Sequence, residues 1–386
     1  MDPIYLDHAA TTPVRAEVRA AMAPFDNEVF GNPSSLHRWG RSAAAALADA
    51  RAEVAGALGA EAGEIVFTRG GTESDNLALF GRCRLLRSRG VVPLVAVTEI
   101  EHPAILDAVD ALVAEGSATR DVLRLNEDGS IHEEDLERVL GAAHPIVSMM
   151  WVNNEIGVTL PVEAVAARVE SAGGTFHSDA VQAVGKVPVS LSEPGIRLLS
   201  VTGHKIYGPK GSGLLFVRAG TELAPMLHGG GQERRLRPGT EDVAGAVGLA
   251  CAVRLVMAEQ IEEANRQRSL RDDFEGAVLE RLDGVRVNAR AMPRAPHVAS
   301  LGIHDVPGDL LLMGLDMEGI AVSGGSACSS GASKASHVIE ALHGSTDTAA
   351  TVRLSLGRHT TRDQMERAVE TLVTVVTRLR ALEAAS

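Results

Sequence analysis

Short apolar runs alternate along this chain with longer segments that have a helical pattern. Runs that are apolar throughout, rather than at every second residue, are typical of strands buried on both faces of a sheet. Six such runs are predicted strands, and each is followed by polar or glycine residues: 65–68, 94–97, 146–150, 175–177, 198–201 and 213–217. The pattern predicts an α/β fold with a mostly parallel central sheet covered by helices. Ligands of such folds bind beyond the carboxyl ends of the strands, so chemistry is expected there.

Three segments have a clear helical pattern. Residues 43–58 are rich in alanine and carry their charges on one side, which favours a helix. Residues 243–282 form a long helical stretch that could join two domains, and residues 362–382 predict an amphipathic C-terminal helix.

A second, smaller α+β domain is predicted beyond the long helical stretch. Residues 285–287 and 297–301 have the pattern of its strands. The first fifteen residues look too loop-like to start a sheet and are expected to pack on this domain. Because 386 residues exceed one typical domain, we predict a large domain over 16–260 and a small domain made of 1–15 and 261–386.

Composition narrows the class of protein. The formal charge of −13 and the 3% of aromatic residues disfavour nucleic-acid binding, which needs clustered cations and stacking rings. The three cysteines are too few for a disulfide framework, so a reducing compartment is favoured. The N-terminus lacks a signal-peptide pattern, and no apolar stretch is expected to span a bilayer. We therefore predict a soluble cytoplasmic protein that binds neither nucleic acid nor membrane.

The most informative residue is Cys328, in the run SGGSACSSG at 323–331. Nothing in this run can pack a core, so the thiol is predicted to lie on a polar loop, as a thiol that travels to a substrate would. Cys83 and Cys251 have helical or apolar neighbours and are interpreted as packing residues. Lys205 follows a predicted strand and begins a glycine-rich turn. A loop thiol and a strand-end lysine together suggest covalent chemistry.

Two further strand ends carry polar groups. The turn 68–74 (TRGGTES) precedes a helix predicted from residue 75. Gly71 lets the backbone approach an anion, and Thr72 adds a hydroxyl near the free N–H groups of the helix. An ordinary strand-to-helix turn is the alternative. His102 follows another strand and precedes a helix that starts at Pro103; a capping or packing role is the alternative to function.

Three more residues are candidates for a buried polar site. Asp179 ends an apolar strand, where a carboxylate is poorly hydrated unless it meets a cation or a donor. Gln182, three residues later, could face the same way. Arg353 lies between apolar residues of a predicted strand and could bind a carboxylate through both nitrogens. A helix N-cap for Asp179 and a structural salt bridge for Arg353 remain open.

Together these signals match the requirements of pyridoxal phosphate. A lysine can form a Schiff base with its aldehyde, an aspartate can keep its ring nitrogen protonated, and a glycine-rich turn can hold its phosphate. Lys205, Asp179 and the turn at 68–74 each follow a separate predicted strand, so they would meet at one edge of the sheet.

At this point the sequence resembles the cysteine desulfurases of the NifS and IscS kind, in the pyridoxal phosphate-dependent class V aminotransferase family. The resemblance runs nearly end to end and implies the type I fold of these transferases. The motifs that carry it are 5–12 (YLDHAATT), 31–37 (GNPSSLH), 70–76 (GGTESDN), 152–157 (VNNEIG), 203–211 (GHKIYGPKG), 228–233 (HGGGQE), 237–240 (RPGT), the Cys328 run and Arg353.

The resemblance also implies roles for individual residues. Lys205 would carry the cofactor, His102 would stack on its ring and help move protons, and Cys328 would be the nucleophile. The other implied contacts are Asp179 at the ring nitrogen, Gln182 and Asn154 at the phenolic oxygen, Gly71, Thr72, Thr202 and His204 at the phosphate, Thr240 at the phosphate of the other subunit's cofactor, and Arg353 with Asn32 and Asn154 at the substrate carboxylate.

The implied reaction converts L-cysteine to L-alanine and leaves the sulfur as a persulfide on Cys328. The long stretch from 324 to 353 resembles the group that feeds iron–sulfur assembly. The expected partners are an iron–sulfur scaffold or a tRNA-thiolating acceptor and a second copy of the chain in a homodimer, with Cys328 as a transient iron–sulfur ligand through its persulfide. Alternatives are a selenocysteine lyase, a cystine lyase, an aminotransferase or a catalytically silent assembly surface.

Overall fold

The computed structural model describes residues 2–324, 336–345 and 347–384. A seven-stranded sheet forms its larger part, and its order is β2-β8-β7-β6-β5-β3-β4. Strand β8 runs antiparallel to both neighbours, and the pairs from β7 to β4 are parallel. The bounds are β2 Ile65–Thr68, β3 Leu94–Thr98, β4 Thr119–Leu123, β5 Ile146–Ser148, β6 Thr175–Asp179, β7 Ile196–Thr202 and β8 Gly213–Val217.

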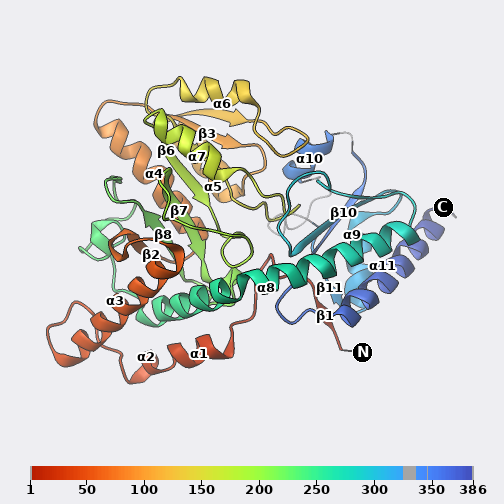
Figure 1. Ribbon diagram of the computed structural model, residues 1–386, viewed down its shortest axis with the longest axis horizontal. Coiled ribbons are helices and arrows are strands. Elements are labelled where there is room, and N and C mark those ends of the chain that lie inside the picture. The colour runs from red at the N-terminus through yellow and green to blue at the C-terminus, as the bar shows by residue number, and fades with distance from the viewer. Residues whose placement is uncertain (1, 325–335, 346, 385–386) are drawn as a thin grey trace.

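The predicted mostly parallel α/β sheet is confirmed, and helices cover both of its faces (Figure 1). Apolar residues of α4 and α5 pack on one face, and those of α3, α6, α7 and α8 contribute to the cluster on the other. The bounds are α1 Ala16–Met22, α2 Pro24–Asn27, α3 Arg38–Leu58, α4 Gly71–Ser88, α5 Pro103–Ala114, α6 Glu133–Leu140 and α7 Val162–Ser171.

Helix α8, Val243–Arg281, runs along both parts of the molecule (Figure 1). Its first half packs against α1 and α3, and its second half against α11. It contains an 18-residue window with a mean hydropathy of 1.4, so by length and composition it could cross a membrane. The expectation that no such stretch exists is therefore wrong. Half of that window is buried inside the fold, as expected of a core helix.

A smaller part is built around its own hydrophobic cluster, to which Ile4 and Leu6 of the N-terminus belong. Its sheets are β12-β10-β9, which is antiparallel, and β1-β11, which is parallel. The bounds are β1 Ile4–Tyr5, β9 Val285–Val287, β10 Val298–Ile303, β11 Ile320–Ala321, β12 Ala350–Ser355, α9 Gly308–Met317, α10 His337–His343 and α11 Arg362–Glu383.

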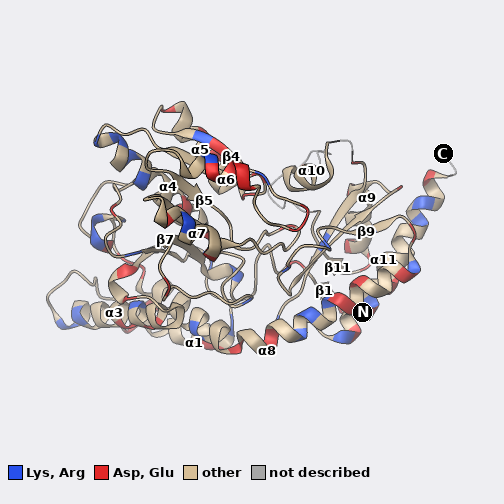
Figure 2. Ribbon diagram, turned by 45° about the horizontal axis from the view of Figure 1, so that its top comes forward, with Lys and Arg blue, Asp and Glu red and all other residues tan. Residues whose placement is uncertain are grey.

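The N-terminal segment is only partly as predicted. It does pack on the smaller part, but Ile4–Tyr5 forms a strand that pairs with β11. A two-residue strand is too short to leave an alternating pattern in the sequence. The division at residue 260 remains a prediction. Charged residues gather on the outer helices, most densely on α6, α8 and α11, and the central strands carry few (Figure 2).

Candidate active site

A cavity of about 310 Å³ lies at the carboxyl ends of the central strands, where β12 of the smaller part approaches them. Both parts line it, because Lys205 and Asp179 come from the large sheet and Arg353 comes from β12. It brings together ten of the predicted site residues: Gly71, Thr72, His102, Asn154, Asp179, Gln182, Thr202, His204, Lys205 and Arg353.

One end of the cavity is the N-terminus of α4. The helix begins at Gly71 and not at residue 75 as predicted, because the polar run TES hides its first turn. Gly70 has φ +144, which favours glycine, and in the described chain no side chain caps the helix. A Cβ on Gly71 would lie 2.8 Å from Val181 Cγ2, so the backbone needs a glycine there. The uncapped N–H groups of this first turn suit an anion.

Lys205 ends a short 3₁₀ turn, Gly203–Lys205, that follows β7. Its Nζ donates to the carbonyl oxygens of Ala9 and Ala10, each at 2.6 Å. The N-terminal segment therefore reaches from the smaller part to the lysine. Hydrophobic patterning gave no sign of this contact; only the motif at 5–12 pointed to the segment.

Asp179 ends β6 and is buried. Its Oδ1 accepts a hydrogen bond from Val181 N at 2.9 Å, and within the described ranges no Lys, Arg or His lies in ion-pair distance of it. Burial raises its pKa. The nearby Asp75 is also buried, and burial followed by the charge of Asp179 raises its pKa well above the usual range. Buried carboxyl groups without a cation are costly and would favour a bound positive group.

His102 is the N-cap of α5, so the capping interpretation is correct. Its Nδ1 accepts from Ala104 N at 3.1 Å, which leaves the proton of the neutral ring on Nε2. Burial lowers the pKa of His102, and its ring also lines the cavity. The capping bond therefore fixes the ring without using the nitrogen that carries the proton.

Arg353 forms the structural salt bridge that was one interpretation of its role, and its binding of a carboxylate remains a prediction. It is 1% exposed, forms an ion pair with Asp7 at 2.7 Å between Nη2 and Oδ1, and donates from Nη1 to the Asn154 carbonyl at 2.8 Å. It nevertheless lines the cavity. Sequence reasoning missed Asp7, although it lies in the motif at 5–12. The backbone of Arg353 also pairs with Ser323, with N to O distances of 2.7 and 3.1 Å.

Three predicted site residues do not line this cavity. Asn32 is exposed, and its side chain accepts from Ser34 N at 2.9 Å. Thr240 is also exposed. Cys328 lies outside the described residues. Cys83 and Cys251 are buried in hydrophobic clusters, as predicted. Within the described ranges, no group of three His, Cys, Asp or Glu residues could hold a metal ion.

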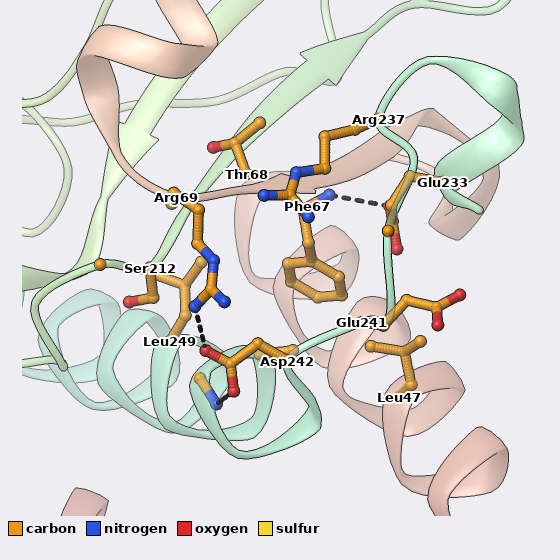
Figure 3. Close-up of a pocket in the computed structure, with 15 residues that line it drawn as sticks. Leu47, Phe67, Thr68, Arg69, Ser212, Glu233, Arg237, Glu241, Asp242 and Leu249 are labelled. Atoms are coloured by element: carbon orange, nitrogen blue, oxygen red, sulfur yellow. Dashed lines mark hydrogen bonds and ion pairs between the residues drawn. The ribbon is translucent and has the colours of Figure 1, made fainter. Parts of the chain in front are cut away.

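A second cavity, of about 30 Å³, adjoins Thr240 (Figure 3). It also contains charged side chains, and Arg69, Glu233, Arg237 and Asp242 are each paired with another residue, whereas Glu241 Oε2 is buried and has no hydrogen-bond partner among the described residues. Arg69 pairs with Asp242 at 2.6 Å, and Glu233 pairs with Arg51 at 2.6 Å and accepts from Phe67 N at 2.8 Å. These groups are neutralised inside the protein, so this cavity has less to offer a reaction.

The chain is similar to known proteins over nearly its whole length. Residues 4–368 match the family model described as Aminotransferase class-V. The chain is 39% identical to "Cysteine desulfurase IscS" of Dictyoglomus turgidum, over 98% of this chain and 96% of that one. It is 40% identical to "Cysteine desulfurase NifS" of Azotobacter vinelandii, over 98% and 94%. A solved structure named "NIFS-LIKE PROTEIN" matches with a TM-score of 0.89 and 31% identity, over 98% of this chain and all of that one.

Proposed function

The chain belongs to the class-V aminotransferase family, and from that premise we propose that it is a cysteine desulfurase that uses pyridoxal phosphate. It converts L-cysteine to L-alanine and retains the sulfur as a persulfide on Cys328. L-cysteine and one thiol give L-alanine and one persulfide, so the atoms balance without an external oxidant or reductant. The desulfurases among its relatives match it along its full length, which supports this reaction over others of the family.

One observation carries the proposal: three features that pyridoxal phosphate requires line the same cavity. They are the amine of Lys205, the buried carboxylate of Asp179 and the uncapped N-terminus of α4. An aldehyde, a basic ring nitrogen and a phosphate would match them in turn. The residues present therefore fit this cofactor.

In the proposed site, Lys205 holds the aldehyde, Asp179 faces the ring nitrogen and His102 lies against the ring. The remaining contacts would be Gln182 and Asn154 at the phenolic oxygen, and Gly71, Thr72, Thr202 and His204 at the phosphate. Burial lowers the pKa of His204 to about 4, and an adjacent phosphate would act against this shift by favouring the charged ring. Bound pyridoxal phosphate supplies a ring that withdraws electrons and makes the α-proton of the attached amino acid acidic.

The protein's own groups would then orient the substrate and move its proton. Arg353 binds the carboxylate of L-cysteine, and Asp7 and the Asn154 carbonyl hold the guanidinium in position. Asn32 would assist at the same carboxylate. Lys205 removes the α-proton, and His102 assists. The buried carboxylate of Asp179 would keep positive charge at the ring nitrogen, since within the described residues no cation lies in ion-pair distance of it.

Cys328 would take the sulfur. Its thiolate attacks the sulfur of the substrate, a sulfur–sulfur bond forms, and the carbon–sulfur bond breaks towards the carbon that becomes the methyl group of alanine. Cys328 follows Ser323 by five residues, and Ser323 pairs with Arg353 at the cavity. The described chain therefore brings the start of the cysteine-bearing segment next to the substrate site.

The same proposal includes the compartment, the oligomeric state and the partners of the protein. The chain works as a cytoplasmic homodimer, in which the exposed Thr240 reaches the cofactor phosphate of the other subunit. An iron–sulfur scaffold or a tRNA-thiolating protein accepts the sulfur, and Cys328 serves as a transient ligand of the nascent cluster. Neither nucleic acid nor a membrane is a partner.

Two variants test the proposal. Cys328→Ala should abolish the formation of alanine and sulfide from L-cysteine and leave the visible absorbance of the cofactor in place. Lys205→Ala should lose the adduct that borohydride traps. Full turnover by Cys328→Ala would refute the persulfide route, because an aminotransferase does not need this thiol. A purified protein with no visible band would favour a silent assembly surface instead.

A further inference from the structure

Lysine is rare in this chain, which contains only Lys186, Lys205, Lys210 and Lys334. The positive charge of the chain is therefore carried almost entirely by arginine. Lys186 is half-buried among the residues of a small cavity behind Lys205, and in the described chain it forms no ion pair with an acid. A lysine placed in a protein interior without an acid is costly and calls for a specific role.

Lys186 is connected to Lys205 through one amide and one carbonyl. Its Nζ donates to Gln182 Oε1 at 2.6 Å. Gln182 Nε2 donates to the carbonyl oxygen of Ala9 at 2.8 Å, and Lys205 Nζ donates to the same oxygen at 2.6 Å. Gln182 and Ala9 are buried, so water does not compete for these bonds.

This connection determines which way the Gln182 amide points. The ammonium form of Lys186 can only donate, so while Lys186 is protonated the atom that faces it must be the oxygen; a carbonyl can only accept, so the atom that faces Ala9 must be the nitrogen. Both ends require the same orientation. Without Lys186, only the Ala9 carbonyl, which Lys205 also occupies, would hold this orientation. We propose that Lys186 is a positioning residue that fixes the Gln182 amide so that its NH₂ group faces the Lys205 side of the cavity.

The groups around Lys186 explain why its charge is not neutralised. Lys205, Arg353, His8, His204 and His297 come close, and all are cations or can become cations. The acids of the small cavity, Glu259 and Glu263, pair with Arg15 and Arg266. Burial, followed by the charges of Lys205 and Arg353, lowers the pKa of Lys186 to about 7.

The consequence concerns ligands that carry an anionic oxygen beside Lys205. An NH₂ group held towards that oxygen stabilises it, whereas a flipped amide would present a second acceptor and repel it. The inference rests on the proposed function, in which this oxygen is the phenolate of the cofactor. Fixing the amide should therefore lower the pH at which the bound cofactor gains its proton next to Lys205.

The test is a pH titration of the visible absorbance after loading with pyridoxal phosphate. Lys186→Met should raise the midpoint by about one pH unit, the order expected for one lost charge-assisted contact, and Lys186→Arg should stay near the wild type because it can still donate. In a Gln182→Ala background, Lys186→Met should add little. Equal shifts in both backgrounds would mean that Lys186 acts by its charge alone, and would overturn the proposal.

Two further measurements keep the inference testable. If Lys186→Met does not fold, Gln182→Glu replaces the NH₂ group by an acceptor and should also raise the midpoint; an unchanged midpoint would overturn the inference. If the wild type shows no visible band, the proposed function fails, and competitive acetylation of the four lysines followed by mass spectrometry still tests Lys186. Lys205 should then acetylate several-fold more slowly in Lys186→Met at pH 8, because a flipped amide offers its ammonium another acceptor; an equal rate would overturn the proposal.

Discussion

The two cavities at this end of the large sheet both contain buried carboxylates, but they differ in whether a cation lies within ion-pair distance of the carboxylate. In the cavity next to Thr240, the carboxylate of Glu233 meets Arg51 and a backbone N–H, and Asp242 meets Arg69 (Figure 3). In the cavity next to Lys205, the carboxylate of Asp179 accepts from a backbone N–H, and within the described residues no cation lies in ion-pair distance of it; the charges of His102 and Lys205 act on it only from farther away.

This difference shows which cavity is built for a reaction. Paired charges hold a structure together and leave little to offer a ligand. A buried acid without a cation raises the free energy of the protein by itself, and a ligand that brings positive charge recovers that cost. Burial accordingly raises the pKa values of Asp75 and Asp179. Variants of Glu233, which is paired with Arg51, and of Asp179 should therefore have different effects on stability and on turnover.

The largest effect is expected for Asp179→Asn. The amide keeps the shape and can still accept from Val181 N, but it loses the negative charge that supports positive charge at the ring nitrogen. Turnover of L-cysteine should fall by about 10²–10³-fold, as for other losses of one electrostatic contact in a transition state. Exchange of the α-proton of L-alanine in D₂O should slow in parallel, and the visible band should remain. Turnover within about threefold of the wild type would contradict the comparison.

Most strands of the large sheet were predictable from the sequence alone. Apolar runs predicted six strands of the large sheet within one or two residues at most ends, because strands buried on both faces need such runs. The strand β4, Thr119–Leu123, was missed. It lies at the edge of the sheet and has the sequence TRDVL, so its exposed and half-exposed polar residues interrupt the apolar run that marks the other strands. The strand Ile4–Tyr5 was missed because two residues give no period.

A smaller effect, on stability alone, is expected for Glu233→Gln. Glu233 is 7% exposed and accepts two bonds from Arg51, so removing its charge leaves a largely buried guanidinium without compensation. Breaking such a pair should lower the free energy of unfolding by about 3 kcal/mol in urea titrations. The more exposed pair of Arg69 offers a matched control, since Arg69→Met should cost less than about 1 kcal/mol. An altered visible spectrum in Glu233→Gln would show that the two cavities are not separate.

The site residues that directly follow a predicted strand were predictable, and those that reach the site in other ways were less so. Lys205, Asp179 and Gly71 follow strands directly, and the fold brings such positions to one edge. Asp7 and Lys186 reach the site through tertiary contacts that no local pattern records: one through Arg353 and the other through Gln182. Each is recognisable only after the side chains it holds have been placed.

The smallest effect is a change in how stability depends on pH. Glu101 precedes His102, is fully buried, and burial raises its pKa from 4.5 to about 8. The folded state therefore keeps this proton after the unfolded chain has lost it, and stability should fall as the pH rises from about 4.5 to 8.

The variant Glu101→Gln tests this expectation, because it cannot ionise and its side-chain oxygen can still accept from Met150 N. Between pH 5 and 8, its free energy of unfolding should decline less steeply than that of the wild type, by up to about 1.4 kcal/mol per pH unit. Urea titrations at several pH values measure this slope. A Glu101→Gln curve that runs parallel to that of the wild type would mean that Glu101 is ionised inside the protein, and the contrast would rest on acids that line the cavity itself, such as Asp75 and Asp179.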